Sequence, residues 1–162
     1  MGRYDSALFS CGFAIGSTYY QDHYSNDRDR RNPRIVVTVA TERNGAIEQT
    51  TQMIVDTGAT WCVLDPEIAE SWGLSPTQDD PLEEYRVRGV LYNGHLVRGR
   101  IILLATNGRS LAVEVTFFVP IADMGEPWPY PNFLGYDSFL SHIRVAIDPH
   151  ENTLYFGADS TG

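Results

Sequence analysis

Stretches of β-branched and aromatic residues alternate with short polar turns along most of this chain. Three of the turns contain an Asn-Gly pair, at residues 44–45, 93–94 and 107–108. An Asn-Gly pair between two apolar runs predicts a β-hairpin, because both central residues of a type I′ turn need a positive φ. The pattern therefore predicts an antiparallel meander that closes into a barrel or a sandwich.

The apolar runs predict strands, and two other segments predict short helices. A capping carboxylate at Asp65, followed by Pro66 and Glu67, is typical of a helix start. Gly73 is typical of a helix end. A second short helix is predicted over residues 136–142 from the spacing of its apolar side chains. The predicted strands cover residues 34–41, 46–55, 61–64, 85–91, 96–104, 111–119, 144–147 and 153–156.

One polar turn differs from the others, because it holds a single carboxylate between two apolar runs. Residues 53–55 lead to Asp56, and residues 61–64 resume the apolar pattern. Gly58 is expected to give this turn a backbone conformation that would strain a residue with a Cβ. A carboxylate between apolar walls suits acid–base chemistry. The alternative is an ordinary surface turn, because Asp, Thr and Gly are all common in turns.

The turn residues Asp56, Thr57, Gly58, Ala59 and Thr60 form a sequence that resembles the active-site signature of retropepsin-like, retroviral-type aspartic peptidases. In that family two copies of the motif face each other, and their carboxylates share a proton and activate a water that attacks the peptide carbonyl. The resemblance implies that Asp56 is the catalytic acid/base and that the Thr57 hydroxyl ties the two loops together. It also implies that Gly58 allows close approach of the two acids and that Ala59 lines the substrate-binding floor.

The resemblance extends over residues 33–157 and implies an all-β fold, a closed antiparallel barrel with a flap hairpin and one or two short helices. A hairpin about thirty to forty residues after the acid corresponds to the flap, which closes over an extended peptide. An apolar-apolar-Gly triplet corresponds to the loop that is threaded by the active-site strand. The residues implied are Tyr92, Asn93, Gly94 and His95 at the flap tip, and Phe133, Leu134 and Gly135 in the triplet.

Three features depart from the family pattern. Residues 1–32 have no counterpart, and we expect them to form an N-terminal extension or arm that packs on the domain of residues 33–157. The predicted flap tip is bulkier than the Gly-rich viral flap, and the loop before Phe133 is long. Residues 158–162 are expected to be a frayed tail. These departures bear on substrate range and dimer geometry rather than on the fold.

Composition and charge exclude several function classes. The net charge of −9, from 12 basic and 21 acidic residues, argues against a nucleic-acid-binding protein, which needs a basic face. No apolar run approaches the roughly 18 residues of a membrane span. The two cysteines and four histidines are not spaced as metal ligands, so we expect neither a metal nor a cofactor. Because the start of the chain makes a poor signal peptide, a cytoplasmic location is favoured.

The predicted function is that of an aspartic endopeptidase that acts on polypeptides as a homodimer. The 162 residues hold a single Asp-Thr-Gly and are too few for two lobes, so a second copy must supply the other acid. Because apposed carboxylates share a proton, activity and dimerisation should both favour mildly acid conditions. Two alternatives remain. One is a retropepsin-fold module for dimerisation or peptide binding with little catalysis, and the other is a structural β-barrel domain of a larger protein with Asp56 in a plain turn.

Overall fold

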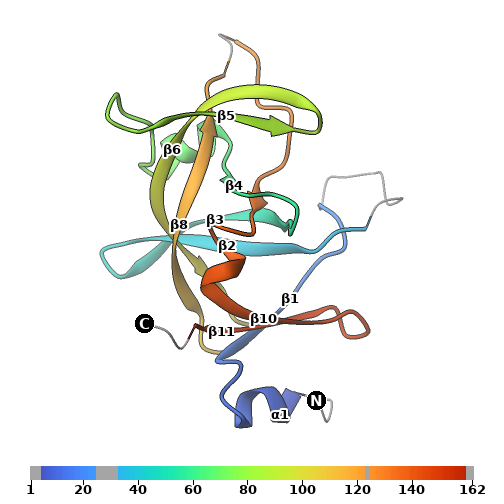
Figure 1. The fold of residues 1–162 in the computed structure, drawn as a ribbon. Coiled ribbons are helices and arrows are strands. Elements are labelled where there is room, and N and C mark those ends of the chain that lie inside the picture. The colour runs from blue at the N-terminus through green and yellow to red at the C-terminus, as the bar shows by residue number, and fades with distance from the viewer. Residues whose placement is uncertain (1–4, 25–32, 123–124, 160–162) are drawn as a thin grey trace.

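The molecule is built from two β-sheets with short helices at their margins (Figure 1). The computed structural model describes residues 5–24, 33–122 and 125–159. One sheet has seven strands and forms the upper body in Figure 1, and the other has four strands and lies below it. This arrangement confirms the predicted all-β class.

The larger sheet closes into a barrel. Its strands run in the order β2-β3-β9-β4-β8-β6-β5, and β2 also pairs with β6. Six strands therefore form a closed ring, and β5 extends the sheet beyond it as the outer strand of a hairpin. The strands are β2 (Val36–Arg43), β3 (Ala46–Val55), β4 (Cys62–Val63), β5 (Leu82–Val87), β6 (Val90–Leu103), β8 (Leu111–Pro120) and β9 (Phe133–Leu134).

Two short parallel pairings interrupt the otherwise antiparallel barrel. Strand β9 runs parallel to β3, with Ile54 opposite Phe133 and Val55 opposite Leu134, and β4 runs parallel to β8. On its other edge β9 is antiparallel to β4. The chain thus inserts a late strand, β9, between two early ones, and the loop that joins β3 to β4 must pass around it.

The smaller sheet has the order β10-β11-β1-β7. Its long pair is β10 (Ile143–Asp148) with β11 (Thr153–Ala158), and β7 (Asn107–Gly108) lies at one edge. Strand β1 (Gly16–Tyr19) pairs with both β11 and β7, and it follows helix α1 (Asp5–Ser10). The segment before residue 33 thus contributes a strand between two later parts of the chain.

Helix α2 (Pro66–Ser71) begins as the sequence predicts, because the Asp65 carboxylate accepts the backbone N–H of Glu67 at 2.8 Å. The predicted helix over residues 136–142 is wrong. Only η1 (Leu140–His142) is helical, as a single 3-10 turn. Phe139, at φ −136° and ψ −63°, is far from helical geometry and separates η1 from the turns before it. No helix in the described part of the chain is both long and apolar enough to traverse a bilayer.

One Asn-Gly pair is a tight hairpin turn. Asn44 and Gly45 have φ values of 54° and 80° and join β2 to β3 as predicted. The predicted turn at residues 93–94 is wrong, because the β5–β6 hairpin turns at Arg88 and Gly89, with φ values of 49° and 86°.

Gly94 lies inside β6 for a packing reason rather than a turn. A Cβ at this position would come within 2.5 Å of the Phe118 ring, so only glycine permits the close approach of β6 and β8. The third pair, residues 107–108, lies in the connection between β6 and β8 and forms β7, which pairs with β1. The predicted hairpin joins the expected strands, but this pair is not its two-residue turn.

The barrel interior is filled with aliphatic and aromatic side chains, and one thiol lies among them. Cys62 is fully buried, its N–H donates to the Ser138 hydroxyl at 2.7 Å, and that hydroxyl donates to Sγ at 3.1 Å. Burial raises the pKa of Cys62 to about 11, and the hydrogen bond from Ser138 opposes this only in part. The largest fully buried side chains include Phe117, Phe118, Phe139, Phe156, Met53 and Leu64.

Alkaline pH should destabilise the fold partly through Cys62. Its pKa is raised from 9.0 to about 11 on folding, so the thiolate forms more readily in the unfolded chain. The free energy of unfolding should therefore fall by up to about 1.4 kcal/mol per pH unit as pH rises from about 9 through 11. Cys62→Ala should flatten this fall in urea unfolding at several pH values. Cys11→Ala, at an exposed thiol, should leave the slope unchanged. Equal slopes in wild type and Cys62→Ala would contradict the assignment.

Candidate active site

Asp56 stands at the end of β3, on the loop that passes around β9. Its backbone N–H donates to the Leu134 carbonyl at 3.0 Å, which continues the β3–β9 pairing by one residue. Its carboxylate oxygen Oδ1 accepts the N–H of Gly58 at 2.9 Å, and its carbonyl accepts the N–H of Ala59 at 3.2 Å. The acid is therefore fixed both by a neighbouring strand and by its own turn.

Gly58 does not have the strained backbone that the sequence pattern predicts. Its φ lies outside the positive range in which other glycines of this chain occur. The constraint is one of space, because a Cβ on Gly58 would lie 3.3 Å from Oδ1 of Asp56. A side chain here would crowd the carboxylate.

The predicted triplet contacts the Asp56 loop directly. Phe133 and Leu134 form β9, and the N–H of Tyr136 donates to the Ala59 carbonyl at 2.6 Å. At Gly135, an added Cβ would lie 2.2 Å from the Trp61 carbonyl oxygen and 2.9 Å from that of Ala59. Glycine is thus required where the two loops cross, and the triplet contacts the loop that carries Asp56.

A cleft with a volume of about 640 Å³ opens beside Asp56. Gly58 and Ala59 line it from the acid's loop, and Phe133 lines it from β9. The β5–β6 hairpin contributes residues 85–88. The carboxylate is partly exposed, so a molecule in the cleft can reach it.

The β5–β6 hairpin is tied to the Asp56 loop through Tyr85, in the middle of its paired stretch. The Tyr85 hydroxyl accepts the backbone N–H of Thr60 at 3.0 Å, and the Tyr85 ring lies 5.3 Å from the Phe118 ring. The hairpin is thereby held close to the acid while its tip, at residues 88–89, extends beyond these contacts.

The residues predicted for the flap tip do not form it and do not line the cleft. Asn93 and Gly94 pair with Glu84 and Glu83 across the hairpin, well inside β6. Nδ1 of His95 lies 3.1 Å from the Asp80 carbonyl oxygen. The sequence pattern places the turn at residues 93–94, so Tyr85, Arg86 and Arg88 are not predicted as site residues. The signal for the true turn is Gly89, which lies between two runs of alternating polar and apolar residues.

An aromatic cluster joins the hairpin to the long loop before β9. The Tyr92 hydroxyl donates to that of Tyr130 at 3.1 Å, which raises the pKa of Tyr92. The Tyr92 and Trp128 rings meet edge-on at 4.9 Å, and the Arg88 guanidinium lies 5.7 Å from the centre of the Tyr130 ring. The long loop, which departs from the family pattern, thus supports the hairpin and its tip.

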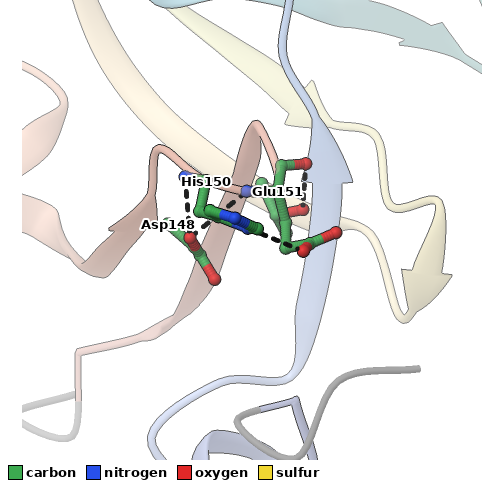
Figure 2. A network of polar contacts seen from close by, with 4 residues as sticks. Asp148, His150 and Glu151 are labelled. Carbon is green, nitrogen blue, oxygen red and sulfur yellow. Dashed lines mark hydrogen bonds and ion pairs between the residues drawn. The ribbon is translucent and has the colours of Figure 1, made fainter.

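A second group of titratable side chains lies in the turn between β10 and β11 (Figure 2). Asp148 accepts the N–H groups of His150 and Glu151 at 2.9 and 3.3 Å, and Nδ1 of His150 lies 2.9 Å from Oε1 of Glu151. The His150 side chain is 90% exposed, so this cluster stabilises a turn in open solvent. In the ranges that the structure describes, no group of three or more His, Cys, Asp or Glu residues could hold a metal ion.

Comparison with known proteins agrees with this geometry. A family model described as aspartyl protease matches residues 37–113, which include the Asp56 loop and the β5–β6 hairpin. A crystal structure of a retropepsin-like aspartic protease from Rickettsia conorii is similar over 86% of this chain and 98% of that one, with a TM-score of 0.53 and 15% sequence identity. The chain has a retropepsin-like fold. The search of curated proteins found no match.

The crossing at Gly135 should be indispensable to this retropepsin-like chain. Gly135→Ala forces a methyl group against two backbone carbonyls that cannot rotate away, so we expect a loss of about 3 kcal/mol in the free energy of unfolding. Urea unfolding of the variant and of wild type measures this loss. Gly99→Ala is the matched control, because its methyl would meet only side-chain atoms of Phe117 and Leu74, and it should cost less. A Gly135→Ala protein as stable as wild type would refute the crowding argument.

Proposed function

We propose that the chain is an aspartic endopeptidase that acts as a homodimer, in which Asp56 of each subunit activates a water to hydrolyse a peptide bond. The observation that carries the proposal is the position of Asp56, which is fixed by β9 and open to a cleft of about 640 Å³. The aspartyl protease family match over residues 37–113 supports it independently of the geometry.

The proposed chemistry needs two carboxylates with one proton between them. The ionised acid accepts a proton from a water while that water's oxygen attacks the peptide carbonyl carbon. The protonated acid donates to the carbonyl oxygen, which gives a neutral tetrahedral diol. When the C–N bond breaks, one acid donates a proton to the leaving nitrogen and the other recovers a proton from the diol. The pair of acids ends in its starting state.

Two observations favour a symmetric dimer. Each chain supplies one Asp-Thr-Gly, so a twofold axis beside Asp56 would bring two such acids together. Thr57 is exposed, and its hydroxyl has no hydrogen-bond partner among the described residues. A second copy of the loop would supply a partner for each hydroxyl.

A polypeptide fits the hairpin better than a compact ligand does. β5 pairs only with β6, so its other edge has backbone N–H and C=O groups that no described strand uses. An extended peptide can pair with such an edge, and side-chain pockets then add selectivity. The open edge lies on the same hairpin whose residues 85–88 line the cleft.

Asp56→Asn tests the proposed chemistry. The amide keeps the shape of the acid but cannot exchange a proton, so cleavage of a peptide library should fall at least about a thousandfold. Asp79→Asn, at an exposed loop acid, should cleave at the wild-type rate. Wild-type activity should also be higher in mildly acid than in alkaline solution, because the proposed pair of acids must keep one proton. Cleavage that survives in Asp56→Asn would overturn the proposal, and binding without any cleavage by wild type would favour the peptide-binding module.

Thr57→Val tests the dimer separately. Valine keeps the volume of threonine but loses the hydroxyl, so each dimer would lose two hydrogen bonds of about 1 kcal/mol each. The dimer dissociation constant from sedimentation velocity should rise about tenfold or more. Thr38→Val removes an exposed hydroxyl from the middle of β2 and should leave the constant unchanged. A Thr57→Val protein that dimerises as wild type does would show that this hydroxyl lies outside the interface.

A further inference from the structure

The cleft carries the opposite charge from the rest of the chain. The chain has a net charge of −9, and all 12 of its basic residues are arginines. Three of these, Arg34, Arg86 and Arg88, line the cleft, and Asp56 is the one acid among the lining residues described. An acidic protein thus has its candidate site in a locally basic region.

The three arginines come from two parts of the fold. Arg86 and Arg88 belong to the end of β5 and the turn at the hairpin tip. Arg34 directly precedes β2, and Figure 1 shows β5 above β2. A peptide bound in the cleft would therefore meet positive charge from both the hairpin and the barrel.

No carboxylate in the described residues pairs with these three guanidinium groups. Nη1 of Arg86 donates to the Gly89 carbonyl at 2.8 Å, and Arg88 stacks on Tyr130. Each guanidinium has five N–H donors, so these contacts leave donors available. Elsewhere some arginines do pair with a carboxylate, as Arg43 does with Glu48 at 3.2 Å. In the cleft these guanidinium groups keep donors that a ligand can use.

We infer that the cleft selects acidic polypeptides, with Asp or Glu side chains near the scissile bond bound by Arg34, Arg86 and Arg88. This inference rests on the proposed function and names its substrate class. A guanidinium matches a carboxylate through two parallel hydrogen bonds, which an amide of the same shape cannot reproduce with equal strength. Apolar walls such as Ile54 and Phe133 concentrate the field of the arginines in the cleft.

Two matched peptide series test the inference. Both contain the same apolar scissile pair, and one Glu is moved along the first series while Gln takes its place in the second. Near pH 6 the Glu side chain is ionised. At low salt, wild type should cleave the best Glu peptide with a kcat/KM about tenfold above its Gln partner. The ratio should shrink at high ionic strength, because salt screens the charges.

Substitutions assign the preference to the cleft. Arg34→Gln and Arg88→Gln should each reduce the Glu/Gln ratio, and the double variant should bring it close to one. Arg98→Gln is the matched control, because Arg98 is an exposed arginine of β6 that does not line the cleft. Arg86 is left intact, because its bond to Gly89 supports the turn itself. A ratio near one in wild type, or a Glu preference that persists in the double variant, would overturn the inference.

Binding separates this inference from the proposed chemistry. Labelled Glu and Gln peptides are titrated with the Asp56→Asn protein, and fluorescence anisotropy gives their dissociation constants. Tighter binding of Glu peptides that depends on Arg34 and Arg88, with no cleavage by wild type, would support the inference and refute the peptidase. Cleavage of Glu and Gln peptides at equal rates would support the peptidase and refute the inference about acidic substrates. A pH optimum that shifts in Arg88→Gln without a change in the Glu/Gln ratio would also overturn the inference, because the arginine would then act on Asp56 rather than on the peptide.

Discussion

The crossing of the two loops at Gly135 is the constraint on which the candidate site depends. β9 enters between β3 and β4, and its end presses against the carbonyls of Ala59 and Trp61, where a Cβ would lie at 2.2 Å from the nearer one. The hydrogen bond from the N–H of Tyr136 to the Ala59 carbonyl closes the same contact. A short acidic turn on its own would move freely. Here it is fixed by a strand that lies about eighty residues later in the sequence.

The same loop also fixes the hairpin that lines the cleft. The N–H of Thr60 donates to the Tyr85 hydroxyl, so the middle of the hairpin takes its position from the residues that follow Asp56. Tyr92, which lies opposite Tyr85 in the hairpin, contacts Tyr130 in the long loop before β9. That loop leads into β9, so the acid and the hairpin are both held by segments that contact or lead into the same threaded strand. A substitution at the crossing should therefore displace residues throughout the cleft.

Local signals in the sequence predict local structure well and long-range packing poorly. Asn44-Gly45 and the Asp65 cap act through neighbouring backbone groups, and both form as expected. Gly94 has the same Asn-Gly signature, but the Phe118 ring across the sheet decides its role. The helix expected over residues 136–142 fails because of the non-helical dihedral angles of Phe139, a fully buried side chain. The Asp56 motif could be found because its residues are contiguous, whereas the arginines of the cleft come together only in the folded barrel.

A basic cleft in an acidic chain is consistent with binding at short range and repulsion at long range. At physiological salt the Debye length is about 8 Å, so most of the net charge of −9 is screened from a peptide that already lies in the cleft. Arg34 and Arg88 line the cleft itself, so their interaction with a charge bound there would be screened far less. The overall charge then opposes the approach of any acidic chain, and only a peptide that places its carboxylates against the guanidinium groups gains enough to remain bound. Selectivity in this arrangement comes from the fit of individual charges rather than from the sign of the whole surface.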